Sequence, residues 1–423
     1  MSPLTVRAVY WRYLVLTAVR WLPVGLLIPV IVLLPLERGL SLSELGLAAS
    51  LQGFAVLALE LPTGGLADSL GRRRVLLLSS VVGITSMVIY LGAESFAAFA
   101  TAFALQGVYR ALDSGPLEAW YVDSVHAADP AASIDRGLSA HGVVLGLSVA
   151  GGALASGGLI ALGPLAGLDA MAVPVVVSLV LQVAGLVGIA VLMVEEPPAS
   201  GARTAVQAVR DTPRTIAEGV LLLRRSKVLM AIICVELFWG FGMVAFESLT
   251  PVRLTEIVGD ADQAAVITGP ASSAAWLASA AGAACMPWVG RRLGIAPAAA
   301  LMRILQGLTV VGLGLFGGVV GVITAYLACY AVHGAANPAH MTLLHRQVEG
   351  NLRATVVSLN SMMALPAASV GAIALTALAD GASVSIAMYV GAAVLAVAAP
   401  LYIPAWRQER GTRAQQLSVA EPA

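Results

Sequence analysis

Long apolar runs alternate with short polar segments along almost the whole chain. Many runs reach about 20 residues, the length at which an α-helix crosses the hydrocarbon core of a membrane. Long unbroken runs also argue against a β-barrel, whose strands alternate apolar and polar positions. The pattern predicts twelve spans, of which the ninth and tenth are the least clearly separated, at 12–36, 44–66, 75–93, 96–120, 138–162, 171–194, 228–251, 264–288, 298–318, 320–345, 354–379 and 383–405.

Composition supports an all-α integral membrane protein. The 423 residues are 59% hydrophobic and 11% charged, whereas soluble domains contain about 25% charged residues. The mean hydropathy is +0.88, and in lipid only helices or closed barrels satisfy the backbone polar groups. The formal net charge is zero, so no nucleic-acid partner is indicated. The three cysteines lie within apolar runs, without the spacing of a disulfide framework or a metal site.

The basic residues orient the spans. If the N-terminus is cytoplasmic, the outer loops contain only Arg38 and Arg253. Apart from three arginines within spans, all other basic residues then face the cytoplasm, as the positive-inside rule requires. We therefore expect a multi-pass protein of the plasma membrane with both termini in the cytoplasm. The arginines within spans are Arg20, Arg110 and Arg303.

A single long polar segment, residues 195–227, separates six spans from six. We expect a six-helix bundle at 1–194, a second at 228–406 and a cytoplasmic tail at 407–423. Within the central segment, residues 212–225 predict an amphipathic helix on the inner membrane surface.

The two halves also echo each other in sequence. Gly71, Arg72 and Arg73, between the second and third spans, match "GRR" at 290–292, between the eighth and ninth. "PLERG" (35–39) and "PVRLT" (251–255) both close a span at an outer loop. Weak internal repetition of this kind is typical of transporter folds.

The segment "GGLADSLGRRR" (64–74) follows the second span with small residues, a carboxylate and three arginines. Its pattern G-x-x-x-D-x-x-G-R-R resembles motif A of the major facilitator superfamily. The resemblance covers essentially the whole chain and implies two six-helix bundles around a central cavity, which alternate between inward-open and outward-open states. The matching residues are Gly64, Asp68, Gly71, Arg72 and Arg73.

Motif A is expected to form an inner gate. Asp68, near a helix end, can interact with an arginine or with a helix N-terminus. The arginines can reach Glu118 and Asp123, at the inner end of the fourth span. Such contacts would form in one state and break in the other, and the resemblance implies the same role. Alternatively, the arginines only anchor the topology, which is the interpretation we favour for Arg74.

Ionisable groups at membrane depth are costly and usually functional. Arg20 and Glu236 lie at equivalent depths in the first and seventh spans, and we expect them to face each other or the cavity. Arg110 and Asp113 can share a helix face. These groups either form static ion pairs or couple transport to protons and substrate. The candidates are Arg20, Glu60, Arg110, Asp113, Glu236 and Glu247.

Two further motifs of the family are incomplete. Motif B, R-x-x-Q-G in the fourth span, has Phe103 at its arginine position, and Arg110, two turns along the same face, is the candidate replacement. "RILQG" (303–307) has the pattern in the ninth span, which we interpret as coincidence. Motif C in the fifth span keeps its glycines but lacks its proline. Small residues there and in the eighth span predict close helix packing or a sliding interface.

Aromatic residues are the candidates for lining a cavity. An apolar, aromatic cavity with a few acids suits amphipathic or cationic organic molecules. Four histidines lack metal-site spacing, and for His333 and His340 we expect neutral packing roles. The aromatic candidates are Tyr109, Trp120, Tyr121, Trp239, Phe241 and Trp276.

No phosphate-binding loop, metal-ligand run or nucleophile elbow is present in the sequence. We therefore expect no enzyme activity, cofactor or metal. The favoured function is a monomeric secondary-active exporter of small amphipathic or cationic, drug-like compounds, in exchange for protons. One alternative is a proton-coupled uptake permease or a facilitator of a small metabolite. The other is a non-transporting sensor or scaffold on the same fold.

Overall fold

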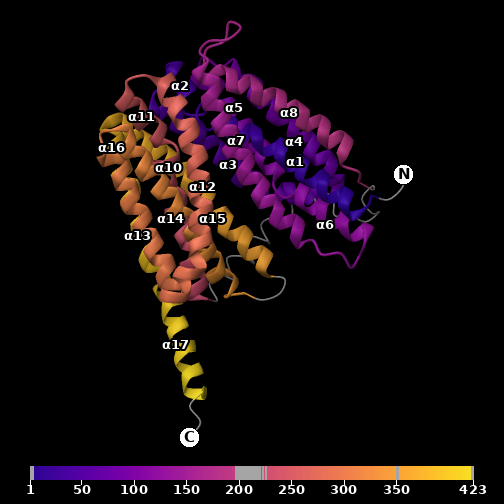
Figure 1. Cartoon of the computed structure of the whole chain (residues 1–423), viewed down its shortest axis with the longest axis vertical. Helices are drawn as coiled ribbons and strands as arrows, with labels where there is room; N and C mark the ends of the chain where they lie inside the picture. The colour runs from indigo at the N-terminus through magenta and orange to yellow at the C-terminus, as the bar shows by residue number, and fades with distance from the viewer. Residues whose placement is uncertain (1–3, 196–220, 222, 224–225, 349–351, 421–423) are drawn as a thin grey trace. The chain divides into compact units, whose positions relative to one another are not determined.

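The computed structural model describes residues 4–195, 221, 223, 226–348 and 352–420, and these are almost entirely helical (Figure 1). Contacts divide the chain into two compact units. Unit 1 comprises Met1–Pro213 and Val258–Ala274, and unit 2 comprises Arg214–Ile257 and Ala275–Ala423. The amphipathic helix expected at 212–225 lies almost wholly outside the described residues.

In unit 1, α1 (Val6–Leu27) packs against α7 (Asp135–Ala161) and α8 (Ala172–Leu192). In the same unit, α4 (Arg72–Leu91) packs against α5 (Phe96–Asp113) and α8. One apolar cluster of unit 1 includes Tyr13, Trp120 and Tyr121. The helices are α1 (Val6–Leu27), α2 (Leu33–Glu37), α3 (Leu42–Leu70), α4 (Arg72–Leu91), α5 (Phe96–Asp113), α6 (Pro116–Ala128), α7 (Asp135–Ala161) and α8 (Ala172–Leu192).

Unit 2 repeats this pairing, because α10 packs against α15 and α16, and α13 packs against α14 and α16. α12 begins in unit 1 and continues into unit 2. The helices after α8 are α10 (Lys227–Glu247), α11 (Leu249–Val258), α12 (Ala261–Leu293), α13 (Ile295–Leu315), α14 (Val319–His345), α15 (Leu352–Gly381), α16 (Val384–Val397), the 3₁₀ helix η1 (Ala399–Tyr402) and α17 (Ile403–Ala420).

Among the described residues, nine helices are long and apolar enough to cross a membrane. Three further helices, α1, α5 and α12, correspond to the remaining predicted spans. α1 carries several arginines, α5 ends on Arg110 and Asp113, and α12 is rich in small residues, which lowers the hydropathy of each. The predicted all-α membrane fold of twelve spans is confirmed.

The predicted fourth span, 96–120, is wrong as a single helix. α5 ends at Asp113, and α6 begins at Pro116 directly after Gly115. Gly115 has φ +91°, a conformation that glycine adopts without strain. Proline is favoured in the first turn of a helix because its missing N–H needs no partner there. The segment "SGP" therefore ends one helix and starts another.

The sequence repeat also needs a correction. Gly71 has φ +91° and separates α3 from α4, and Gly294 has φ +92° and separates α12 from α13. Gly294, not Gly290, is thus the counterpart of Gly71. As a result Arg291 and Arg292 lie in the last turn of α12, whereas "RRR" opens α4.

The close packing predicted for the fifth span is present within unit 1. A Cβ atom on Gly152 of α7 would lie 2.9 Å from the Cα of Gly25 in α1. Real Cβ atoms do not approach so closely, so both helices need glycine here. Similarly, in unit 2, a Cβ on Gly334 of α14 would lie 2.7 Å from the Cα of Ser279 in α12.

Candidate functional site

The turn at Gly71 is closed by an acidic residue that lies three positions beyond Leu192, the last residue of α8. Glu195 accepts the backbone N–H groups of Arg72 and Arg73, each at 2.8 Å. A carboxylate at this position compensates the partial positive charge of a helix N-terminus. The Arg73 side chain donates to the carbonyl of Ala190 at 2.5 Å. Motif A therefore makes three hydrogen bonds to the end of α8 and to the residue Glu195 that follows it.

Arg72 connects the start of α4 to α6. Its guanidinium forms an ion pair with Asp123 and donates to the carbonyl of Ala119 at 2.9 Å. Glu118, the other expected partner, lies 3.4 Å from Nε2 of His141 on α7 instead. Gly64 and Asp68 lie in α3, and their side-chain environment is outside the described part of the structure.

Arg20 on α1 pairs with Asp113 at the end of α5. The guanidinium contacts the Asp113 carboxylate and also donates to the Asp113 backbone carbonyl at 2.8 Å. Both side chains are largely buried, and Tyr109 lies beside them. Removing either charge would leave the other unpaired in a buried position, which is strongly destabilising.

Two other charged candidates in unit 1 lie differently. Arg110 shares α5 with Asp113 but is exposed, so the partner of Asp113 is Arg20 rather than its own neighbour. On α3, the Oε2 atom of Glu60 is buried, and among the described residues it has no hydrogen-bond partner.

In unit 2, three helices bring a carboxylate together with two basic residues. Oε1 of Glu236, on α10, lies 3.3 Å from Nε2 of His340 on α14 and 3.8 Å from Nη2 of Arg303 on α13. All three side chains are buried. Arg303 also donates to Oε1 of Gln306 at 3.0 Å. Glu236, which we expected to face Arg20 or the cavity, thus has two basic partners, Arg303 and His340, within unit 2.

His340 is the centre of this cluster. Its Nε2 lies 2.9 Å from Oδ1 of Asn360 on α15, and its Nδ1 lies 2.8 Å from the hydroxyl of Tyr402 in η1. Nε2 faces only oxygen acceptors and so carries a hydrogen. A tyrosine hydroxyl can donate to a neutral imidazole or accept from a protonated one. The imidazole can therefore hold one or two protons without losing a hydrogen bond.

Sequence reasoning missed Arg303 and His340 as site residues. A signal for Arg303 was present, because "RILQG" supplies both Arg303 and its partner Gln306. Because we interpreted that pattern as coincidence, Arg303 was left out of the candidates, although it is the only arginine in the second half that lies inside a predicted span. For His340 no local signal existed, since Asn360 and Tyr402 come from other helices.

The aromatic candidates divide into two groups. Trp120 and Tyr121 are each 2% exposed and belong to the core of unit 1, so the expectation that they line a cavity is wrong. Trp239 is half-buried and stacks on His333, with ring centroids 5.6 Å apart. Tyr109, Phe241 and Trp276 are also half-buried, and Glu247 is exposed at the end of α10.

The sequence profile of the Major Facilitator Superfamily matches residues 13–365. The chain belongs to this superfamily. No curated protein sequence matches the chain significantly. Membership of the superfamily indicates a transporter of small molecules rather than an enzyme.

Solved structures of other transporters share the fold of this superfamily member. The nucleoside transporter NupG has a TM-score of 0.76 at 12% identity, covering 93% of this chain and 98% of that chain. A bacterial homolog of the human lysosomal transporter Spinster, inward-facing and unoccupied, has 0.72 at 14%, covering 95% and 97%. A POT family transporter in complex with 5-aminolevulinic acid has 0.67 at 14%, covering 94% and 95%. At these identities the likeness is one of fold.

Proposed function

We propose that this superfamily member is a secondary-active exporter of small amphipathic or cationic organic compounds in exchange for protons. The observation that carries the proposal is the buried cluster of Glu236, His340 and Arg303. Ionisable groups inside a membrane protein are costly to keep, and they commonly mark ion or substrate pathways.

The cluster has the properties of a proton site. An ionised Glu236 is attracted to both Arg303 and His340. Protonation of the carboxylate removes this attraction and changes the charge of a buried site by one unit, which biases a two-state protein strongly. A proton bound here and a cationic substrate would then favour different states.

The aromatic surroundings support a cationic, amphipathic substrate. Trp239 lies one helical turn from Glu236 on α10, and residues at this spacing lie on neighbouring parts of one helix face. Its indole Nε1 is buried and has no hydrogen-bond partner among the described residues. Aromatic rings attract organic cations through their faces. A carboxylate near such rings completes a site of that class.

We further propose that Arg72 and Asp123 act as the inner-gate latch of motif A, with Arg20 and Asp113 as a second coupling pair. The ion pair between Arg72 and Asp123 joins α4 to α6. A contact of two exposed or half-exposed side chains can be broken at modest cost, as a gate requires.

The first test is accumulation of a cationic dye in efflux-deficient cells that express the protein, with and without a protonophore. We expect lower dye than in cells with an empty vector, and recovery on uncoupling. Glu236→Gln should abolish the difference at equal expression. Glu94→Gln, which changes an exposed residue, is the matched control. Increased dye would favour uptake, and unchanged dye would contradict a broad cationic exporter.

Proton exchange is tested directly in liposomes with a pH-sensitive dye inside. Adding a transported cation should drive proton movement in the wild type and not in Glu236→Gln. Substrate flux in the wild type without proton movement would contradict the exchange and favour a facilitator. No flux of any tested substrate would favour the sensor or scaffold alternative.

A further inference from the structure

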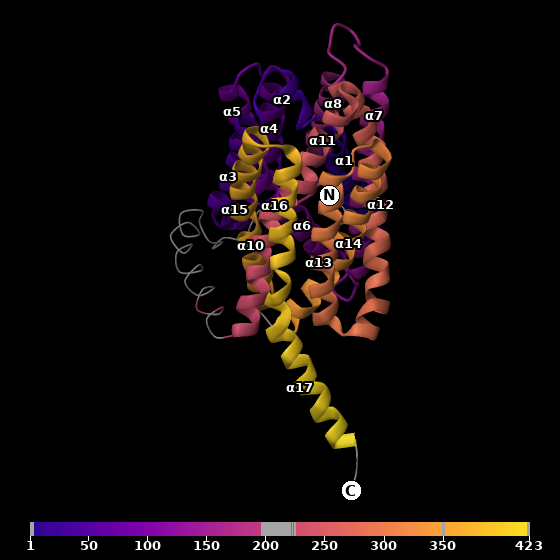
Figure 2. The same cartoon turned by 90° about the vertical axis from the view of Figure 1, so that its left-hand side faces the viewer.

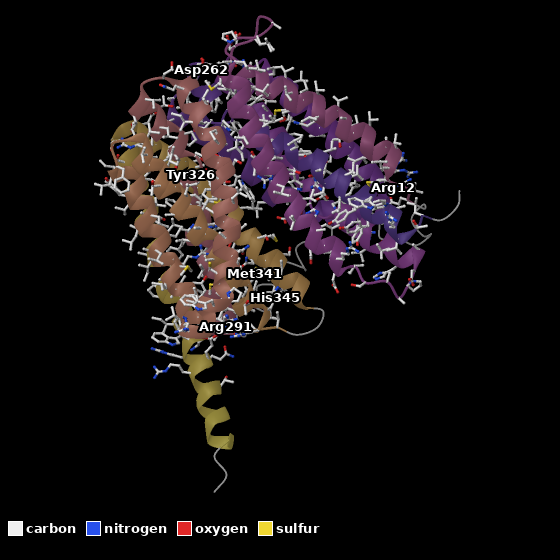
Figure 3. The ribbon with its side chains drawn as sticks, viewed as in Figure 1. Arg12, Asp262, Arg291, Tyr326, Met341 and His345 are labelled. Atoms are coloured by element: carbon white, nitrogen blue, oxygen red, sulfur yellow. The ribbon has the colours of Figure 1, made fainter. Side chains whose placement is uncertain are left out.

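Unit 2 contains a cavity of about 530 Å³ at one end of its helices. It lies where α12 ends and α13 begins, between the end of α14 and the start of α17. Figure 3 shows Arg291 and His345 at this end of unit 2, from which α17 extends, and Figure 2 shows α17 continuing beyond the other helices of the unit. Lining residues from each part include Leu293, Pro297, Arg346, Trp406 and Arg410.

The cavity has an excess of positive charge. Its single carboxylate, Glu409, is already compensated, because it pairs with Arg346 at 2.6 Å and accepts the backbone N–H of Ala296 at 3.1 Å. Arg410 is exposed, and among the described residues it has no hydrogen-bond or ion-pair partner. Arg291 and Arg292 follow at the end of α12. An anion in the cavity would therefore meet an unneutralised guanidinium.

Apolar surface leads directly to the cavity. An exposed stripe runs along one face of α13, and Pro297, one turn before its first member Leu301, lines the cavity together with Leu293, the last residue of α12. A second set of exposed apolar residues extends from α16 into α17 and ends at Trp406, which also lines the cavity. In a membrane protein, such side chains face acyl chains. The first stripe comprises Leu301, Ile304, Leu308, Val311 and Leu315, and the second comprises Val390, Val397, Ile403 and Trp406.

Tryptophan marks the depth of the cavity in the membrane. Trp406 is 44% exposed and Trp288 is 57% exposed. The guanidinium of Arg292 lies 5.5 Å from the ring centre of Trp288. Exposed tryptophans with neighbouring arginines are typical of the level of the lipid headgroups. The cavity is thus polar and basic at headgroup level, and continuous with apolar surface at acyl-chain level.

We propose that this cavity binds the phosphate-bearing headgroup of an anionic phospholipid, with Arg410 as its principal contact and the acyl chains along α13 and Trp406. Basic pockets between helices at a membrane surface suit such headgroups, and guanidinium–phosphate hydrogen bonds are among the strong ones. The proposal is independent of the transported substrate, since it uses none of the residues of the Glu236 cluster.

The test uses the full-length protein in detergent and native mass spectrometry. Phosphatidylglycerol, phosphatidylcholine and glycerol phosphate, the last without acyl chains, are titrated separately. We expect a single phosphatidylglycerol to bind in preference to phosphatidylcholine. Arg410→Gln should weaken that binding about fivefold, because one cation near the headgroups contributes about 1 kcal/mol.

Arg407→Gln is the matched control, because Arg407 is exposed on the same helix, carries the same charge and does not line the cavity. Its affinity for phosphatidylglycerol should match that of the wild type. Equal losses in both variants would overturn the site in favour of diffuse attraction. Equal binding of phosphatidylcholine would overturn headgroup selection, and tight binding of glycerol phosphate would show a site for a free phosphate instead.

Discussion

Glu195 caps the helix that begins at Arg72, although 123 residues separate the two in sequence. Unit 2 has the same arrangement, because Glu409 accepts the backbone N–H of Ala296 near the start of α13. Glu195, which follows α8, thus closes the turn between α3 and α4. Glu409, which follows α16, closes the turn between α12 and α13. The first N–H groups of a helix have no partner within it, so a distant carboxylate can supply one.

Glu195→Gln should lower the free energy of unfolding by about 1 kcal/mol, because it removes the charge that compensates the N-terminus of α4. Thermal unfolding of the purified protein in detergent measures the change. Glu94→Gln, which changes an exposed residue, should leave the transition unchanged. An unchanged transition in Glu195→Gln would show that the cap is energetically neutral.

Arg72→Ala should impair transport more than Asp123→Asn. Both remove the ion pair, but only the first also leaves the carbonyl of Ala119 without its guanidinium donor. Initial transport rates at matched expression compare the two. If Asp123→Asn proves the more damaging, the carboxylate has a partner other than Arg72 in the working cycle.

Arg20→Gln and Asp113→Asn should each lower folded yield sharply, since each leaves a buried charge unpaired at a cost of about 3–5 kcal/mol. The double variant should recover the yield, because it removes both charges. Yield is measured by fluorescence-detected size exclusion and transport by the dye assay. Recovery of both would show a static pair, and recovery of yield alone would show a role in coupling.

Arg38 and Arg253 should differ in their contributions to stability. Arg38 donates to the carbonyls of Tyr90, Leu91 and Ala93 at the end of α4, at 2.8–3.4 Å. Arg253 donates to one helix-end carbonyl, that of Phe316 after α13, at 3.2 Å, and its other contact is an ion pair with Glu256, one turn along α11, at 2.8 Å. A cation at a helix C-terminus contributes about 0.3–1 kcal/mol. Arg38→Gln should therefore lower the unfolding temperature more than Arg253→Gln, and the reverse order would contradict this.

Glu37 should make the stability depend on pH. Partial desolvation, together with the nearby carboxylates of Asp262 and Asp169, raises the pKa of the exposed Glu37 above its ordinary value. The folded state then binds this proton more tightly than the unfolded state, so the contribution is favourable at low pH and is lost as pH rises through the raised pKa. Comparing unfolding temperatures of the wild type and Glu37→Gln across this range measures it. A difference that does not vary with pH would contradict the assignment.

Several features of this protein followed from its sequence because they depend on local chemistry. The length of each apolar run is set by membrane thickness, so the spans could be located without knowing their neighbours. The turn at Gly71 was recognisable from "GRRR". The break in the fourth span also had a local signal, "SGP" before Glu118. The apolar residues on both sides of it nevertheless led to the prediction of one continuous span.

The sequence by itself determined the helical membrane fold, the repeated halves and the resemblance to the superfamily, whose match over residues 13–365 confirms the membership. It also predicted that certain charges lie within the spans. Only the tertiary structure decided their partners: Asp113 pairs with Arg20 rather than with Arg110, and Glu236 faces His340 and Arg303. The reason is physical. The cost of burying a charge demands a partner but does not say which, and helices that are distant in sequence meet only when the bundle packs.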